Sequence, residues 1–548
     1  MLAREILCGL LFLTITSASV CRGDDFYVDA LNGSDQTGDG SASSPWRTIT
    51  HSLAQIGPGD LTTEHTLHVR PGVYDSSIGE VFPLRPGIHV SLQATSASSE
   101  TLIRGDTGKD VLLFDKRIKD GKEQRVSGIQ ISGGLNGVVW SLVFTGVSSP
   151  LTLTNTTITK CSKAGVYLPP NTGFSPILVD GCKVSENGTG FLAKATLFAH
   201  FVDIFNSELT DNLSDGFYLL GDGYMQSSWE VNSTKISRNG GAGILLKSDH
   251  RSAMSGTLVN STISHNARGG FEGRSYPRCY YIPYYGYRCY SGQIGPGRVH
   301  NNTIYGNGPP GGMTGNNPSY VDAASVSSII WGNSPIDVGP GFQHAPYSNI
   351  ETGGAFGSGT IHLPPDFVDG PGGDLRLRRT SPCIDLGAPF PSSYVPPTDI
   401  EGETRILDGG SGVARIDMGS DEFATFVAPT SPPVKGSPFQ LFTQAPPAEE
   451  GLAVVVLFSG GKSTGSGIPL PGSGGRTVDL ESDSIFGLGV GLLPLLQATI
   501  QGGQGVTTPV TIPAGLPFTG DVFYAGVSID LAAGQYVSIT PTHSFTVQ

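Results

Sequence analysis

The chain has few charged residues, few histidines and few tryptophans, and it lacks motifs that identify several common enzyme classes. Asp, Glu, Lys and Arg make up only 15% of its 548 residues, and it contains 11 His and 4 Trp. A phosphate-binding loop, the dinucleotide fingerprint Gly-x-Gly-x-x-Gly and a paired Cys-x-x-Cys are absent. The scattered histidines disfavour a catalytic zinc site. The sequence therefore argues against nucleotide-dependent enzymes and zinc enzymes.

Long helical segments and, after residue 23, long apolar segments are also missing. The only helix that the sequence predicts is short, from Thr48 to Ile56, and no later stretch is long enough to span a membrane. The 77 Gly and 39 Pro indicate a turn-rich, all-β protein of two or three domains. The net charge of −14 predicts no binding to nucleic acid. It also weakens binding of polyuronates unless calcium or a local basic patch intervenes.

A block of about 26 residues recurs between Leu151 and Asn333. Each copy carries a polar turn, an aliphatic residue and, three residues later, a second polar anchor. The anchors are separated by 26, 25, 27, 27, 41 and 26 residues, and they are Cys161, Asn187, Asn212, Asn239, Asn266, Asn307 and Asn333. A fixed period of this size predicts stacked units that bury their apolar faces on one another.

Each unit contains three short stretches in which apolar or β-branched residues alternate with others, as in Leu151–Thr154, Thr156–Thr159 and Gly165–Leu168. Alternation indicates β-strands, and stretches of about four residues are too short for the helices of a helical solenoid. We therefore predict a triangular β-solenoid in which equivalent residues stack about 4.8 Å apart. In such a stack the anchor asparagines would form one column.

Segments outside the repeat are similar to known proteins. They are Phe26–Asp35, Ser44–Thr50 and Val69–Tyr74 near the start, and Ser381–Gly387, Thr398–Gly402 and Asp417–Phe423 further on. With the repeat, they resemble the secreted bacterial right-handed parallel β-helix proteins of the pectate-lyase-like superfamily, over roughly residues 24–423. The resemblance implies a right-handed, single-stranded parallel β-helix. It implies no single function, because the superfamily holds lyases, hydrolases, epimerases and inert scaffolds.

The first 23 residues have the features of a signal peptide, with Arg4 before an apolar core and small residues after it. Cleavage after Ser19 or after Gly23 would release the mature chain, and lipidation of Cys21 is a less favoured alternative because Val20 is large. We therefore expect a protein that is secreted or held at the cell envelope, where disulfides are allowed.

The expected organisation has six parts. These are a signal peptide (1–23), an N-terminal cap with the first coils (24–150), regular repeats (151–340), a closing segment (341–423), a linker (424–434) and a small antiparallel β-sandwich (435–548). Within the last part, Ile512–Gly520 and Val522–Asp530 resemble a C-terminal β domain of some secreted planctomycete-type proteins.

An insertion at residues 274–290 lengthens one repeat to 41 residues and is rich in Tyr and Arg. Tyrosine rings stack on sugars and donate hydrogen bonds, while Arg binds carboxylate or sulfate groups. We predict a loop that Cys279 and Cys289 bridge as a disulfide and that binds a ligand. Packing against the coil and contact with a protein partner are the alternatives. The candidate ligand-binding residues are Arg274, Tyr276, Arg278, Tyr280, Tyr281, Tyr284, Tyr285, Tyr287, Arg288 and Tyr290.

Other candidate sites carry weaker signals. Asp29, Asn32, Asp35 and Asp39 would offer oxygen ligands to a structural Ca²⁺, although an Asx-rich turn explains them as well. A glycosidase needs two carboxylates, and the candidates are Glu208, Asp211, Asp215, Glu230 and Glu272. A lyase needs a base beside a cation, for which the segment 247–251 with His265, Arg268 and Arg274 supplies the residue types.

The function that the sequence favours is binding of an extracellular or envelope polysaccharide along a solenoid face and through the Tyr/Arg insertion. The main alternative is an enzyme that cleaves an acidic polysaccharide, a lyase before a glycoside hydrolase. The third alternative is a structural surface protein in which the solenoid serves as a spacer. Calcium is the only cofactor considered, and a monomer is the default expectation.

Overall fold

A computed structural model of the protein describes most of the chain after residue 23. The described residues are 24–57, 64–96, 100–115, 123–141, 150–170, 175–195, 200–223, 226–250, 252–276, 278–282, 286–290, 293–315, 325–339, 342, 344–353, 357–389, 395–402, 405, 415–423, 426–430, 433–445, 449, 451–461, 468–470, 477–478, 480, 482, 496–501, 504–511, 521–531, 535–540 and 543–546. The predicted signal peptide therefore lies outside the described residues.

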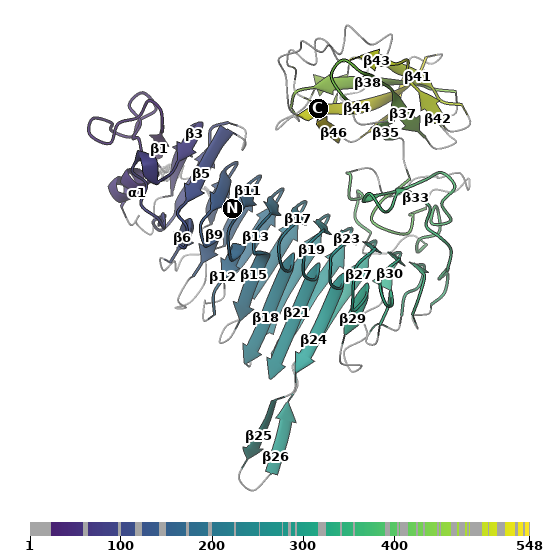
Figure 1. The fold of residues 1–548 in the computed structure, drawn as a ribbon, viewed down its shortest axis with the longest axis horizontal. Coiled ribbons are helices and arrows are strands. Elements are labelled where there is room, and N and C mark those ends of the chain that lie inside the picture. Colours follow the sequence, from purple (N-terminus) through teal and green to yellow (C-terminus); the bar gives the residue numbers. More distant parts are fainter. Residues whose placement is uncertain are drawn as a thin grey trace, which may run out of the picture.

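Three parallel sheets form the faces of a solenoid, and each regular coil contributes one strand to each sheet (Figure 1). The first sheet consists of β1 (Asp25–Val28), β2 (His65–Val69), β4 (Val90–Ala94), β7 (Gln124–Ser127), β10 (Leu151–Thr154), β13 (Ser175–Asp180), β16 (His200–Phe205), β19 (Gln226–Asn232), β22 (Ala253–Val259), β27 (Gln293–His300) and β30 (Ser325–Val326).

The second and third sheets follow in the same coils. The second sheet consists of β3 (Gly72–Tyr74), β5 (Thr101–Gly105), β8 (Gln130–Gly133), β11 (Thr157–Thr159), β14 (Lys183–Ser185), β17 (Glu208–Thr210), β20 (Lys235–Ser237), β23 (Thr262–Ser264), β28 (Thr303–Tyr305), β31 (Ile329–Trp331) and β32 (Asn349–Ile350). The third sheet consists of β6 (Leu112–Phe114), β9 (Asn136–Trp140), β12 (Ala164–Leu168), β15 (Thr189–Ala195), β18 (Phe217–Gly223), β21 (Ile244–His250), β24 (Phe271–Tyr276) and β29 (Met313–Gly315).

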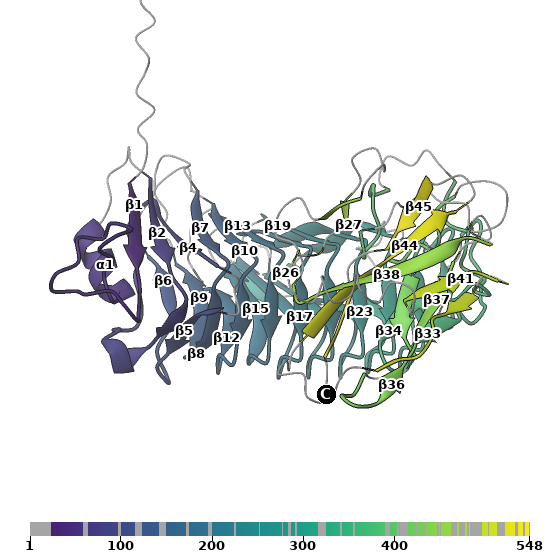
Figure 2. The same cartoon turned by 90° about the horizontal axis from the view of Figure 1, so that it is seen from above.

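Equivalent residues of successive coils pair without a shift over most of the solenoid, so that like side chains form columns. In the second sheet one inward column is aliphatic and fully buried throughout: Ile131, Ile158, Val184, Leu209, Ile236, Ile263, Ile304 and Ile330. The coils stack along the long axis of the molecule (Figure 2). The prediction of a parallel β-solenoid is confirmed, and parallel pairing reaches back to β1, before the sequence repeat becomes visible.

The predicted column of anchor asparagines is also present. The side-chain amide of Asn239 donates to the carbonyl of Leu209 at 2.9 Å and to Oδ1 of Asn266 at 2.9 Å, while its own Oδ1 accepts from the backbone and side-chain nitrogens of Asn212. The same pattern recurs at Asn212, Asn266 and Asn307, whereas Asn187 Oδ1 accepts from the Cys161 backbone amide alone. Every hydrogen-bonding position of the Asn212, Asn239, Asn266 and Asn307 amides is therefore filled.

The first position of this column is Cys161, which is buried and free, as is Cys182 in the next coil. The absence of a bond between these two cysteines fits their different offsets within the repeat.

A short helix closes the N-terminal end of the solenoid, as the sequence predicts. Helix α1 (Ile49–Ile56) begins after Thr48, whose hydroxyl accepts from the His51 amide, and it ends at Gly57. Ile49 and Leu53 are buried in the solenoid core. A one-turn 3₁₀ helix, η1 (Ser76–Ile78), follows β3. The helix covers apolar residues that an open end would expose to water.

The closing segment is attached to the solenoid through buried charged side chains. Arg405 is fully buried and donates to Asn260 Oδ1 at 2.9 Å and to the Gly419 carbonyl at 2.7 Å, and it pairs with Glu422 at 3.4 Å. The Asp417 carboxylate accepts from two backbone amides, those of residues 385 and 423. The described part of this segment contains one antiparallel pair, β33 (Phe367–Asp369) and β34 (Asp374–Leu377).

The C-terminal part is built from antiparallel sheets, as predicted. One sheet consists of β41 (Gln497–Thr499), β38 (Ala453–Ser459), β44 (Asp521–Asp530), β45 (Gln535–Ile539) and β46 (His543–Thr546), and another of β35 (Phe426–Pro429), β37 (Leu441–Gln444) and β42 (Gln504–Val506). Short pairs join β36 (Pro438–Phe439) to β43 (Val510–Thr511) and β39 (Ile468–Pro469) to β40 (Thr477–Val478). Val427 and Leu441 share one core with Val454 and Tyr524, so the two larger sheets pack face to face as a sandwich.

Replacement of Asn239 by Leu should strongly destabilise the solenoid. The change leaves the Asn212 backbone amide without its acceptor, and the Leu209 carbonyl and Asn266 Oδ1 each lose one donor in a buried column. Each unsatisfied buried group costs about 1–3 kcal/mol, so we expect a loss of roughly 3 kcal/mol or more in the free energy of unfolding. Urea unfolding measures this loss. The exposed Lys183→Ala variant should change stability by no more than about 0.5 kcal/mol; equal stability of the two variants would contradict the prediction.

The stability that Asp417 contributes should fall as the pH rises. Burial raises the pKa of its carboxyl to about 7, against the opposing effect of two backbone hydrogen bonds. Because the unfolded chain loses this proton near pH 4, the folded state binds more protons between about pH 4 and 7, and its stability decreases over that range. The shift corresponds to roughly 4 kcal/mol.

Comparison with Asp417→Asn isolates this effect. The stability of the wild type relative to Asp417→Asn should be highest near pH 4 and should decline towards pH 7, as measured by urea unfolding at each pH. Glu186→Gln, at an exposed turn, is the control for general pH effects. A difference between wild type and Asp417→Asn that does not vary with pH would refute the assignment.

Candidate functional site

The outer face of the third sheet gathers cations and tyrosines into columns. Side chains alternate along each strand, and because Phe217 and Ile244 point into the core, their neighbours point outward. One outward column reads Lys194, Leu220, Lys247, Arg274, and the next reads Tyr167, Leu192, Tyr218, Leu245, Glu272. We call these two columns, with Lys163, Arg268 and Tyr276 beside them, the third-sheet face.

Two tyrosine rings on the third-sheet face carry a lysine ammonium group above them. Lys163 Nζ lies 3.7 Å from the centre of the Tyr167 ring, and Lys247 Nζ lies 5.2 Å from the centre of the Tyr218 ring. The two rings stand in one column two coils apart, which corresponds to about 10 Å. The arrangement combines flat ring surfaces with positive charge at a regular spacing.

The surroundings of Tyr218 also include acidic groups. Burial, followed by the negative charges of Asp215 and Asp249, raises the pKa of the Tyr218 hydroxyl, and Arg274 opposes this effect. The hydroxyl is therefore protonated at neutral pH and remains able to donate a hydrogen bond.

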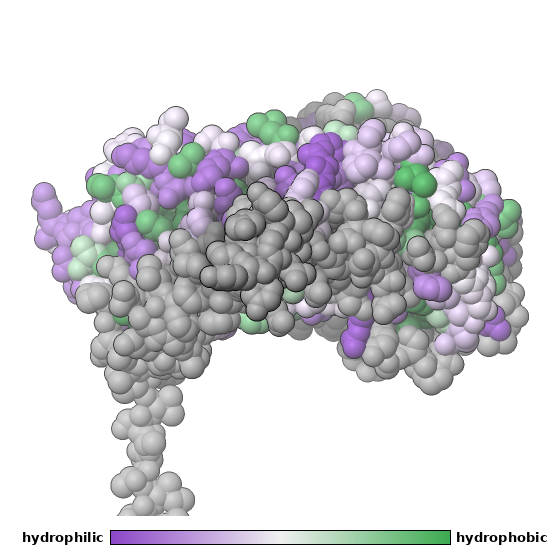
Figure 3. Space-filling model, turned by 90° about the horizontal axis from the view of Figure 1, so that it is seen from below, coloured by the Kyte–Doolittle hydropathy of each residue, from purple (hydrophilic) through white to green (hydrophobic). Residues whose placement is uncertain are grey.

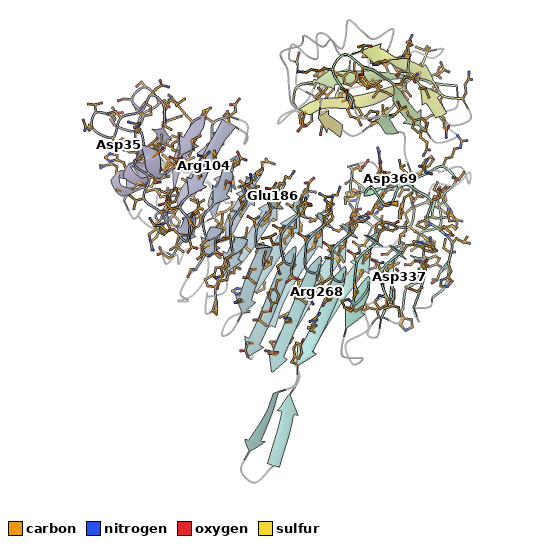
Figure 4. The ribbon with its side chains drawn as sticks, viewed as in Figure 1. Asp35, Arg104, Glu186, Arg268, Asp337 and Asp369 are labelled. Carbon is orange, nitrogen blue, oxygen red and sulfur yellow. The ribbon has the colours of Figure 1, made fainter. Side chains whose placement is uncertain are left out.

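A buried carboxylate organises the arginines of the third-sheet face. The Glu272 side chain is only 1% exposed, contacts Arg274 Nη2, and lies 3.3 Å from Arg268 Nη2. The pKa of Arg274 is raised because Glu272 and Tyr276 stabilise its charge, although burial opposes the shift. Figure 4 labels Arg268 in the coils next to β21 and β24. The side chain of Arg268 is 41% exposed and that of Arg274 is 31% exposed, so both are accessible to a ligand.

The Tyr/Arg insertion continues directly from the third-sheet face. Its described backbone forms a hairpin of β25 (Arg278–Ile282) and β26 (Gly286–Tyr290), which projects from the end of β24 (Figure 1). Cys279 stands opposite Cys289 in the hairpin register, a placement that suits the predicted disulfide, which stays a prediction. Tyr276 is described with its side chain, which is 42% exposed.

The remaining residues of the insertion divide into two groups. The backbone places Arg278 opposite Tyr290, Tyr280 opposite Arg288 and Tyr281 opposite Tyr287. Tyr284 and Tyr285 lie outside the described residues. Ligand binding by the insertion therefore stays a prediction. The structure adds that the backbone of the insertion forms a hairpin.

The five candidate carboxylates of a glycosidase are distributed over all three sheets and the turns between them. Glu208 lies on the second sheet, Glu230 on the first opposite Asp203, and Glu272 on the third. Asp211 is bound by Arg238 through two hydrogen bonds of 2.7 Å, and the buried Asp215 accepts from the backbone amide of Ala242. The fold does not bring these five side chains together.

The candidate lyase residues are partly brought together. Lys247 and Arg274 are neighbours in one column, and Arg268 shares Glu272 with Arg274. His265 lies apart from them, at the turn after β23, where its ring packs edge-on against Tyr305. Burial and the charge of Arg238 lower the pKa of His265.

The candidate calcium ligands lie near α1, at the N-terminal end of the solenoid, where Figure 4 labels Asp35. Asp29 accepts from the amides of residues 31 and 32, Asp35 from the amides of Arg47 and Thr48, and Asp39 from the amide of Ser41. These are turn-stabilising bonds. Within the described ranges, no three His, Cys, Asp or Glu side chains are grouped to hold a metal ion. Calcium binding stays a prediction.

Sequence reasoning singled out the insertion but missed Tyr167, Lys194 and Tyr218. These residues carry no motif. Only their offset from a Gly-apolar pair that recurs in the repeats, as at Gly165-Val166, Gly190-Phe191 and Gly216-Phe217, would have aligned them. Seen from below, the described surface mixes hydrophilic and hydrophobic residues (Figure 3). No helix in the described part of the chain is both long and apolar enough to cross a membrane.

Family models match two overlapping parts of the chain, and the description of one agrees with the fold. Residues 125–334 match a family model described as "Right handed beta helix region", and residues 31–216 match one described as "Protein of unknown function (DUF1565)". A search of curated proteins gives no match. The crystal structure of the tailspike protein gp49 from Acinetobacter baumannii bacteriophage Fri1, a capsular polysaccharide depolymerase, is similar at 10% identity and a TM-score of 0.34, covering 91% of this chain and 83% of that chain.

Replacement of Glu272 by Ala should destabilise the protein moderately. The two arginines lose the buried carboxylate that holds them, but both reach solvent and can turn outward. We therefore expect a loss of about 1–2 kcal/mol, below the 3–5 kcal/mol of a fully buried pair. Thermal unfolding measures the loss, with Glu186→Ala at an exposed turn as the control. Wild-type stability of Glu272→Ala would show that Glu272 does not organise the face.

Proposed function

Since the chain is a right-handed parallel β-helix protein, we propose that it is an exported protein that binds an anionic polysaccharide along its third sheet and through the hairpin. The observation that carries the proposal is the outward column of Lys194, Lys247 and Arg274 beside the lysine-covered rings of Tyr167 and Tyr218. Export rests on the signal-like residues 1–23.

The charges of the third-sheet face favour an anionic ligand over a neutral one. Lys247 and Arg274 are on adjacent strands, so two like charges stand about 4.8 Å apart at the backbone. A carboxylate or sulfate bound between them relieves their repulsion, and Arg274 offers a planar pair of donors. Arg278 and Arg288 add two more positive charges along the hairpin backbone. This local excess of cations supplies the basic patch that a chain of net charge −14 needs for such a ligand.

The periodicity of the face favours a polymer. Equivalent positions repeat at every coil, and the two ring-and-lysine pairs recur after two coils. A polysaccharide repeats its rings and acidic groups in the same way, so that several sugar units are held at once. Binding several weak sites on one chain raises the overall affinity.

Substitutions on the face test the proposal. Lys247→Ala and Tyr218→Ala should each reduce affinity for an oligogalacturonate or a sulfated glycan by about tenfold, because each removes a charge or stacking contact. Isothermal titration calorimetry at low and high salt measures the affinity, which should fall with salt. Lys183→Ala is the matched control, because Lys183 is an exposed lysine on the second sheet. Unchanged affinity in both face variants would refute the site.

Removal of the hairpin separates its role from that of the face. In one coil, three residues lie between Asp249 and Ala253. The equivalent positions in the next coil are Tyr276 and Gln293, and residues 277–292 lie between them. Replacing residues 277–292 by three residues therefore restores the shorter connection. We expect weaker binding with the coils intact; full retention of binding would exclude the hairpin as a contact.

Incubation with a panel of acidic and neutral glycans tests the enzymatic alternatives. Unsaturated products that absorb ultraviolet light would indicate a lyase, and new reducing ends would indicate a hydrolase. Either result would replace binding by cleavage as the function. Absence of binding to every acidic and neutral glycan, with and without calcium, would favour the structural alternative.

A further inference from the structure

A second polar site lies on a different face of the molecule, where the closing segment meets the second sheet. A cavity of about 660 Å³ is present there, within the usual range for ligand pockets. Its floor is formed by outward residues of three successive coils, including Glu208 and Lys235. Its walls come from β34 and from the segments around Glu401 and Asp421.

The walls of the cavity are fixed in place by direct contacts. At one side, the hydroxyl groups of Thr262 and Ser420 are 2.9 Å apart, which joins the closing segment to β23. Asp421 accepts from the Leu377 amide at 2.8 Å, and Asp374 binds Arg376 through two hydrogen bonds of 2.9 and 2.6 Å. Because both walls are anchored, the cavity is a preformed feature of the fold.

The lining of the cavity is polar and carries more acidic than basic groups. Four carboxyl groups, those of Glu208, Asp374, Glu401 and Asp421, face two cations, Lys235 and Arg376. Leu375 and Ile400 are its apolar side chains. Such a lining disfavours an apolar or aromatic ligand and repels uronate, sulfate and phosphate groups.

Two of the acidic groups contact a cation directly. Glu208 lies 3.8 Å from Lys183, and Arg376 donates two hydrogen bonds to Asp374. Burial raises the pKa of Asp421, and the negative charge of Glu401 raises it further. Burial also raises the pKa of Glu401, against the attraction of Arg376 and Lys235. An additional positive charge in the cavity would therefore stabilise the ionised carboxylates.

We propose that this cavity binds a polar ligand that carries a protonated amine, such as a short oligomer of an amino sugar. The amine would sit among Glu208, Glu401 and Asp421, while the hydroxyl groups of the ligand bond to the polar side chains of the floor. The site is separate from the third-sheet face and opposite to it in charge preference. Failure of this proposal would therefore leave the proposed function untouched, and the reverse also holds.

Calorimetric titration of the full chain tests the ligand class. The probes are a glucosamine trimer, its fully N-acetylated form, spermidine and a galacturonate trimer. We expect binding of the glucosamine trimer and at least about tenfold weaker binding of the N-acetylated trimer, which lacks the charge. If spermidine binds as tightly as the trimer, the requirement for a protonated amine is supported and the site is assigned to polyamines. Equal binding of the acetylated trimer, or no binding of either amine, would overturn the proposal.

Two variants place the binding in the cavity. Glu401→Gln and Glu208→Gln each preserve shape and remove one charge, and the Glu208 side chain is 49% exposed. Each should weaken binding of the glucosamine trimer by about tenfold or more, whereas Glu186→Gln, on an outer turn, should not. Both variants should keep the wild-type melting temperature and affinity for anionic glycans. Wild-type affinity for the trimer in both variants would overturn the proposal.

Discussion

The structure depends on a column of buried asparagines that must satisfy one another. Each side-chain amide in this column makes its hydrogen bonds to the coil before and the coil after, so no coil can shift or tilt without leaving polar groups unsatisfied. The aliphatic column in the second sheet fills the interior at the same spacing. Together they fix the register of the regular coils, and the register decides which outward side chains become neighbours.

The function that we propose is a consequence of this register. The three sheets share one backbone geometry, yet their outer columns differ: the third sheet presents cations over tyrosine rings, whereas the second sheet alternates Lys183, Glu208 and Lys235. Fold alone therefore says little about the ligand, and the chemistry belongs to the residues at the outward positions. The insertion adds to one face because it leaves the coil at the end of β24, where the cation column ends.

The closing segment solves a different physical problem, which is how to end a stack of strands. It does so with buried carboxylates that accept from backbone amides and with Arg405, which reaches back to Asn260 of the solenoid. Burying so much charge is costly unless every group is paired, and the raised pKa of Asp417 reflects that cost. The same segment forms the walls of the cavity on the second sheet, so it both ends the solenoid and creates a candidate binding site.

The sequence by itself determined the solenoid, the short capping helix and the column of Asn187, Asn212, Asn239 and Asn266, because a repeat of fixed period leaves its mark at regular intervals. It also located the insertion, since 41 residues stand where about 26 are usual. Only the tertiary structure brought Lys247 over Tyr218 and placed Glu208 and Glu401, which lie far apart along the chain, in the lining of one cavity. Such meetings depend on which coil lies on which and on where the closing segment folds back, and no local pattern of residues records either.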